Sequence, residues 1–158
     1  MMTNIMTTIT LNRQELRAAA YAGIERRLSG IAKQRPAYYG ADSRHNEWQI
    51  DVIGSIAEYA VAKHLNIYWE PATNQPLANL PGDVGTYQVR STCWPNGQLI
   101  IHQRDKPEAP FILAVVTDNQ IHLKGWLYGH EAATHGEQRE HGDYWIPQQH
   151  LHPMEQLP

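Results

Sequence analysis

The sequence has 158 residues, of which 42% are hydrophobic and 18% are charged, and its formal net charge is -3 with histidine neutral. These values are typical of one globular domain with a real core and exclude a disordered tail. The small negative charge provides no overall attraction to nucleic acid, so polyanion binding would need a local patch or metal ions.

Cysteine usage and hydropathy exclude further classes of protein. Cys93 is the only cysteine, which excludes an intrachain disulfide and a thiolate zinc site and is typical of a reducing compartment. Residues 1–10 lack the apolar run of a signal peptide, and no stretch approaches the roughly 20 apolar residues that cross a bilayer. We therefore expect a cytoplasmic protein without a membrane span.

A first helix is predicted over residues 13–30. Asn12 and Glu15 have the spacing of a capping box at its start. Four apolar side chains recur at helical spacing and are expected to form its buried face: Leu16, Ala20, Ile24 and Leu28.

Arginines occupy the other face of this helix and allow two interpretations. They form either a solvated surface or a surface that faces a phosphate group beside the site. The residues are Arg13, Arg17, Arg26 and Arg27.

A second helix, residues 47–65, is apolar over most of its surface and is expected to be largely buried. Gly54 in its middle predicts the close approach of another backbone, because glycine costs about 1 kcal/mol relative to alanine there. Asp51, Gly54 and Glu58 share one face. A buried carboxylate needs a partner, so Glu58 either pairs with Arg90 or binds a metal ion.

The rest of the chain alternates turns and short apolar runs. The Trp94–Gly97 turn predicts that the strands before and after it form an antiparallel hairpin. Residues 34–46 break regular structure around Tyr38 and Tyr39, and residues 70–81 are expected to cover the site. A short helix is expected over 131–140 and a helical turn within 151–157. The predicted strands are 7–10, 67–69, 87–92, 99–102, 111–117, 121–127 and 144–146.

One histidine pair invites a zinc interpretation that its spacing excludes. His130 and His135 flank a glutamate, but they are five residues apart. A zinc-protease helix needs two histidines four residues apart on one face. The tail histidines His141, His150 and His152 are expected at the surface.

The stretch from Gly82 to Thr92 carries the main functional signal. Gly82 and Gly85 bracket Asp83 in a turn, and the following strand places Gln88 and Arg90 on one face. An acid beside two hydrogen-bonding side chains is one possible arrangement of a site that binds a cation and a phosphate. The alternative is the polar face of an ordinary strand.

Glu58 on a helix, Asp83 in a turn and Gln88-Val89-Arg90 on a strand form an order that resembles the PD-(D/E)XK nuclease superfamily. The resemblance covers residues 47–117. It implies an α/β (α+β) fold with a restriction-endonuclease-like core, in which helices flank a central mixed β-sheet. The N-terminal helix (13–30) and a polar C-terminal extension (128–158) would complete a single domain.

The resemblance also implies site residues and a cofactor. Glu58 and Asp83 would bind Mg²⁺ or Mn²⁺, Gln88 would be a weak third ligand or orient a water, and Arg90 would hold the scissile phosphate. Two positions depart from the family pattern: Gln88 replaces an acid and Arg90 replaces a lysine. Arginine stays protonated and cannot act as a general base. Three side chains after the next strand are expected to contact phosphate or to be plain surface charge: His102, Arg104 and Lys106.

Three functions follow from these observations. The first is an Mg²⁺-dependent nuclease that hydrolyses DNA phosphodiester bonds, with dimerisation as in many small nucleases. The second is a catalytically inactive module on the same fold that binds a host protein or nucleic acid. Such a module would be a phage accessory or inhibitor protein. The Gly125-Trp126-Leu127 segment and the Tyr144–Pro147 ending resemble small phage or prophage proteins of unknown role that share this core. The third is an unrelated α/β fold in which Glu58 is simply a buried, paired acid.

Overall fold

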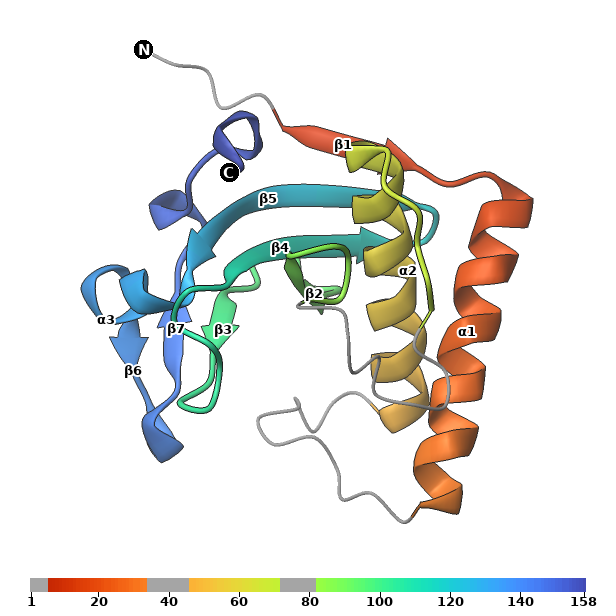
Figure 1. The fold of residues 1–158 in the computed structure, drawn as a ribbon, viewed down its shortest axis with the longest axis horizontal. Helices are drawn as coiled ribbons and strands as arrows, with labels where there is room; N and C mark the ends of the chain where they lie inside the picture. The colour runs from red at the N-terminus through yellow and green to blue at the C-terminus, as the bar shows by residue number, and fades with distance from the viewer. Residues whose placement is uncertain (1–5, 34–45, 72–81) are drawn as a thin grey trace.

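The computed structural model describes residues 6–33, 46–71 and 82–158. Two long helices dominate the N-terminal half: α1 (Arg13–Ala32) and α2 (Glu47–Leu65). They run antiparallel, with α2 against the sheet and α1 outside it (Figure 1). Both begin with the capping box that their sequences favour, Asn12 with Glu15 and Asn46 with Gln49. The two predicted helices are confirmed.

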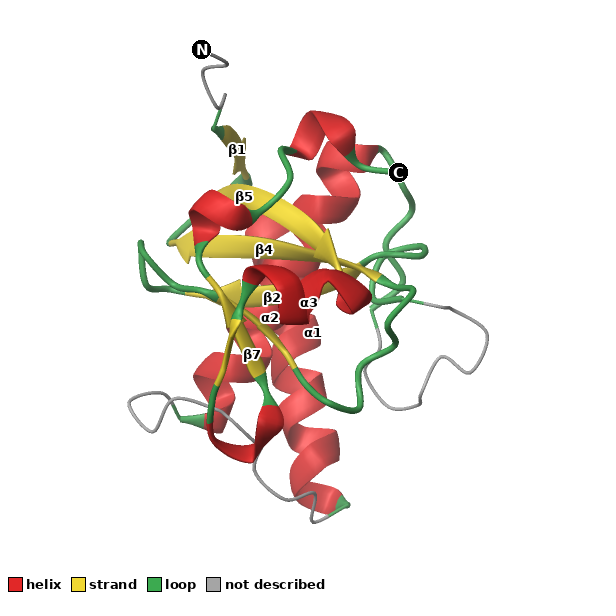
Figure 2. Ribbon diagram, turned by 90° about the vertical axis from the view of Figure 1, so that its left-hand side faces the viewer, coloured by secondary structure: helices red, strands yellow, loops and turns green. Residues whose placement is uncertain are grey.

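Two sheets follow. The larger has the order β1-β5-β4-β2, in which β2 is parallel to β4 and the other pairs are antiparallel. The smaller is antiparallel with the order β3-β7-β6, and β7 runs across the direction of β4 and β5 (Figures 1 and 2). The predicted class, a mixed sheet flanked by helices, is confirmed. The elements are β1 (Thr7–Thr10), β2 (Gln88–Thr92), β3 (Leu99–Ile101), β4 (Pro110–Thr117), β5 (Gln120–Tyr128), α3 (Ala132–His135), β6 (Glu137–Gln138) and β7 (Tyr144–Ile146).

Strand β4 is buried on both faces, which explains its unbroken apolar sequence. Ile112 and Ala114 face a core shared with α2 and β5. Phe111 and Leu113 face a second core. Leu99 of β3, Ala132 of α3 and Ile146 of β7 also belong to this core. The predicted central strand is therefore confirmed, and it separates two hydrophobic cores.

The predicted hairpin between β2 and β3 is wrong. β2 is the edge strand of the larger sheet and pairs in parallel with β4, whereas β3 pairs with β7. The Trp94–Gly97 turn does form, with Gly97 N–H donating to Trp94 O over 2.9 Å. A turn reverses the chain without choosing the pairing partner. Burial chooses it here, because Leu99 and Ile101 are 0% and 4% exposed in the second core.

The predicted apolar ridge of α1 is also wrong in its second half. Ile24 and Leu28 are 40% and 47% exposed. The face against α2 consists instead of small residues, with Arg27 among them. A Cβ on Gly23 would lie 2.5 Å from Val52 Cα, so only glycine allows the helices to approach this closely. The buried residues of α1 are Ala19, Ala22, Gly23, Arg27 and Gly30.

Smaller predictions have mixed outcomes. β1, β5, β7 and a helical turn at Met154–Gln156 form as expected. Residues 67–69 form no strand, and the expected helix over 131–140 is limited to α3, after which β6 begins. Tyr38, Tyr39 and most of the predicted covering loop lie outside the described residues. None of the helices in the described ranges is long and apolar enough to cross a membrane.

Candidate functional site

A groove of about 1110 Å³ lies beside the edge strand β2. Its lining comes from α2 and Arg26 of α1, from β2 and the turn after it, and from parts of the smaller sheet. Lys106 is exposed and is not part of the lining. All the other predicted site residues line the groove: Glu58, Asp83, Gln88, Arg90, His102 and Arg104.

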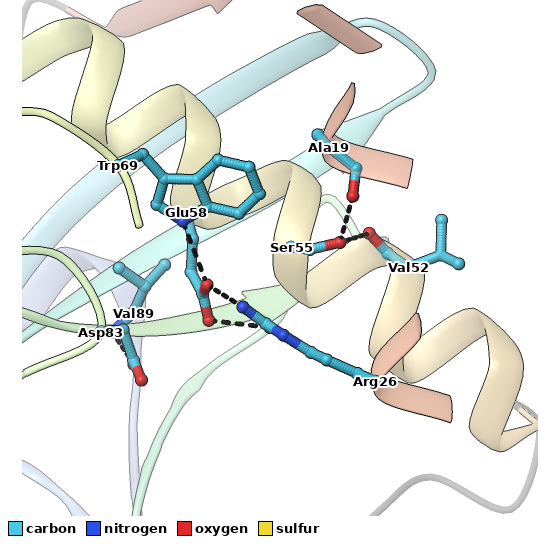
Figure 3. Close-up of polar contacts among 8 residues, drawn as sticks. All are labelled: Ala19, Arg26, Val52, Ser55, Glu58, Trp69, Asp83 and Val89. Carbon is cyan, nitrogen blue, oxygen red and sulfur yellow. Dashed lines mark hydrogen bonds and ion pairs between the residues drawn. The ribbon is translucent and has the colours of Figure 1, made fainter. Parts of the chain in front are cut away.

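Glu58 projects from α2 and is held by Arg26, which the sequence placed on a solvated or phosphate-facing surface of α1 and not opposite Glu58. Arg26 Nη1 donates to Glu58 Oε1 over 3.1 Å, and Nη2 donates to Oε2 over 2.5 Å. Trp69 Nε1 donates to Oε2 over 3.4 Å. Figure 3 shows this fork-shaped pair between the two helices. The predicted pair of Glu58 with Arg90 is therefore wrong, and Arg26 takes that place.

The pKa of the Glu58 carboxyl is raised above its usual range, because burial disfavours the charged form. Arg26 and Trp69 oppose this shift, and the nearby charge of Asp83 reinforces it. Burial acts to lower the pKa of the Arg26 guanidinium, but the hydrogen bond to Glu58 and the charges of the nearby acids together raise it. Glu58 is thus a desolvated acid whose negative charge depends on a neighbouring cation.

Asp83 is fixed by the turn that the sequence predicted. Its Oδ2 accepts a hydrogen bond of 2.9 Å from the Val89 amide (Figure 3). A Cβ at Gly82 would lie 2.5 Å from Tyr87 O, and Gly85 has φ +58°, so both glycines are required by the backbone. Burial raises the pKa of Asp83, while the Val89 amide and Arg90 lower it.

Gln88 and Arg90 share one face of β2, as predicted. They are in register with Phe111 and Leu113, which belong to the second core. Val89, on the other face, packs against the core that contains α2. Because β2 is an edge strand, side chains from both of its faces line the same groove.

The Arg90 guanidinium is held through one of its terminal nitrogens. Its Nη2 donates to Asp105 Oδ2 over 2.6 Å, and its guanidinium lies 5.1 Å from the centre of the Phe111 ring. Asp105 Oδ2 also accepts the His102 amide over 2.7 Å. The Arg90 Nε–H is buried and has no acceptor among the described residues, which costs about 1–3 kcal/mol.

Gly54 does not closely approach another backbone among the described residues, contrary to the prediction. A Cβ at this position would meet no atom of residues 6–33, 46–71 and 82–158 within 4 Å, and Gly54 lines the groove. The missing side chain leaves room beside Glu58. Asp51, one turn earlier, lies 3.5 Å from Nη1 of Arg27, which also bonds Glu47 over 2.7 Å.

The acids of the groove supply the oxygen ligands that a hard cation prefers, but they do not form a complete set of ligands around it. Mg²⁺ is typically held by one or two carboxylates, with water and substrate phosphate completing its shell. Asp83 and Glu58 supply two carboxylates, and Gln88 supplies an amide oxygen. Within residues 6–33, 46–71 and 82–158, no three His, Cys, Asp or Glu side chains are placed to hold a metal ion.

Comparison with known proteins gives no match: no family model, curated protein or solved structure is significantly similar to the chain. The resemblance to the nuclease superfamily thus remains a prediction from the motif and its order.

Sequence reasoning missed two partners of the predicted site residues, Arg26 and Asp105. A signal for Arg26 did exist, because Ala19, Gly23 and Gly30 fall on the same side of α1 as Arg26. Such small residues indicate a helix–helix interface. Asp105 follows a turn after β3 and carried no comparable signal.

Proposed function

We propose that the protein binds nucleic acid in this groove and hydrolyses its phosphodiester bonds with a divalent metal ion. One observation carries the proposal. Two acids with raised pKa values, the buried Glu58 and the half-buried Asp83, line the same groove as Gln88, Arg90 and Arg104. Perturbed acids next to phosphate-binding cations in a groove are typical of an active site.

The division of roles follows from charge. Glu58 and Asp83 would hold the metal ion, which neutralises phosphate charge and lowers the pKa of a water molecule. Arg90 stays protonated and therefore binds phosphate instead of taking a proton. Its unsatisfied Nε–H gains an acceptor if the side chain turns toward a phosphate oxygen. His102 is a weaker phosphate ligand, since its Nδ1 already lies 2.9 Å from Asp143 Oδ2.

Calorimetric titration with Mg²⁺ and Mn²⁺ tests the proposal, together with cleavage of plasmid, linear and single-stranded DNA. The wild type should bind metal and cut, and Asp83→Asn should lose both. Asp118→Asn is the matched control. Asp118 lies in the β4–β5 turn outside the groove, at φ +53°, where asparagine is well tolerated. Equal metal binding by Asp83→Asn and the wild type would refute the assignment of Asp83.

A second function, binding without cleavage, is favoured by the Arg26–Glu58 pair. Both carboxylate oxygens of Glu58 bond to the Arg26 guanidinium, which provides the cation that a metal ion would otherwise provide. In that case the wild type would retain nucleic acid on a gel but form no product with either metal.

A further inference from the structure

One part of the groove lining, the aromatic end, carries tryptophan side chains from elements other than α2. Trp94, in the turn after β2, and Trp145 of β7 line the same groove as Glu58 and Asp83. Trp94 is 40% exposed. The guanidinium of Arg139 lies 4.3 Å from the centre of the Trp145 ring and also lines the groove. This end therefore presents flat, polarisable surfaces next to positive charge.

The turn that carries Trp94 is held in place from several sides. Trp94 N–H donates to Thr92 Oγ1 over 3.1 Å, and Gly97 N–H donates to Trp94 O over 2.9 Å. Gln148 Nε2 donates to the carbonyl oxygens of Pro95 and Gly97 over 2.8 and 2.9 Å. A turn fixed in this way loses little conformational entropy when a ligand binds.

The aromatic end is within reach of the cationic part of the groove. Trp94 follows Arg90 by four residues, so their Cα atoms are at most about 14 Å apart. That distance is a few nucleotides along a strand, since the charge spacing along one strand of B-DNA is about 3.4 Å. A phosphate near Arg90 and a base on Trp94 can thus belong to the same short segment.

We infer that Trp94 forms a stacking site for an unpaired nucleobase, so that the groove takes single-stranded nucleic acid. The inference rests on the proposed function. A paired base has both faces covered by its neighbours in the duplex and cannot stack on a side chain. Unpaired bases stack on aromatic side chains and on arginine planes, whatever their sequence. The Arg139–Trp145 pair offers a second such surface.

Fluorescence anisotropy tests the inference, with labelled oligothymidine, oligouridine and a blunt DNA duplex as probes in EDTA to prevent cleavage. Trp94→Ala should weaken single-strand binding by about 5- to 150-fold, which corresponds to one stacked base. Trp94→Phe should restore most of the affinity. The slope of affinity against salt should stay unchanged in both variants, because no phosphate contact is removed.

Trp48→Ala is the matched control. Trp48 is 43% exposed, close to the value for Trp94, but lies at the start of α2 and outside the groove lining. If Trp94→Ala and Trp48→Ala bind oligothymidine equally, the stacking site is refuted while the proposed function stands. Stronger wild-type binding to duplex than to both single strands also refutes it. If the wild type binds none of the probes either in EDTA or in Mg²⁺, nucleic-acid binding itself fails.

Discussion

Helices α1 and α2 lie side by side, yet they bury different kinds of side chain. In α2 the face that lies against the sheet is apolar and buried, as with Ile56 and Val61. In α1 the larger apolar side chains Ile24, Leu28 and Ile31 are 40–54% exposed, while Arg27 is buried. The difference shows that hydrophobic periodicity locates a helix face only where large side chains form the contact. Where backbones approach closely, small residues form it instead.

The largest effect is expected from Gly23→Val, which places a branched side chain into the helix contact. The new Cβ would lie 2.5 Å from Val52 Cα and 2.6 Å from Ser55 Oγ. Overpacking against backbone should cost about 3 kcal/mol of unfolding free energy, measured by urea denaturation. A loss of less than about 1 kcal/mol would mean that the helices move apart at little cost. The close contact would then not determine which face of α1 is buried.

A pair of truncations compares the two faces directly. Ile56→Ala in α2 removes a side chain that is 7% exposed and should cost about 3 kcal/mol. Leu28→Ala in α1 removes one that is 47% exposed and should change stability by about 0.5 kcal/mol or less. Guanidinium denaturation measures both. Similar losses in the two variants would show that the outer face of α1 is covered in solution.

The Arg26–Glu58 pair links the helices and can be isolated by a double-mutant cycle. The variants are Arg26→Met, Glu58→Gln and their combination. The wild-type side chains of Arg26 and Glu58 are 18% and 11% exposed. Each single substitution therefore leaves the other polar group desolvated and without its partner. We expect a coupling energy of about 2 kcal/mol. Additive effects in the cycle would indicate that the two groups do not stabilise one another.

Gly54→Ala is expected to have a smaller effect, opposite in sign to Gly23→Val. In the part of the chain that the structure describes, no atom lies within 4 Å of a Cβ at Gly54. Alanine should therefore stabilise α2 by up to about 1 kcal/mol through helix propensity, as a rise in Tm. A fall in Tm would show that residue 54 touches another part of the chain. The added methyl group also narrows the groove, so a loss of ligand affinity is expected together with the gain in stability.

The pH dependence of stability should be the mildest effect. The pKa of Glu58 is raised in the folded state, so the folded protein holds this proton at pH values where the unfolded chain has released it. Unfolding free energy should then fall as pH rises from about 4 through the folded pKa. The pKa of Asp83 is also raised in the folded state, so its effect on stability has the same sign. Glu58→Gln and Asp83→Asn should each flatten the slope in thermal melts. A steeper slope in either variant would contradict these directions.

Part of the candidate site could be predicted from local sequence. Gly82, Asp83 and Gly85 dictate their turn through backbone conformation, and alternation along β2 places Gln88 and Arg90 on one face. Glu58 followed from the period of α2. The partners did not follow, because Arg26 and Asp105 are 32 residues from Glu58 and 15 residues from Arg90 along the chain. An ion pair over such a separation depends on how the elements pack.

The sequence alone determined the elements whose causes are local: the capping boxes that start α1 and α2, the Trp94–Gly97 turn, and the apolar run that became β4. Tertiary structure decided everything that depends on which surfaces meet. It paired β3 with β7 instead of β2 and turned Arg26 and Arg27 of α1 toward α2. Capping and turn formation involve a few neighbouring residues, whereas strand pairing and helix orientation depend on how surfaces from distant parts of the chain fit together.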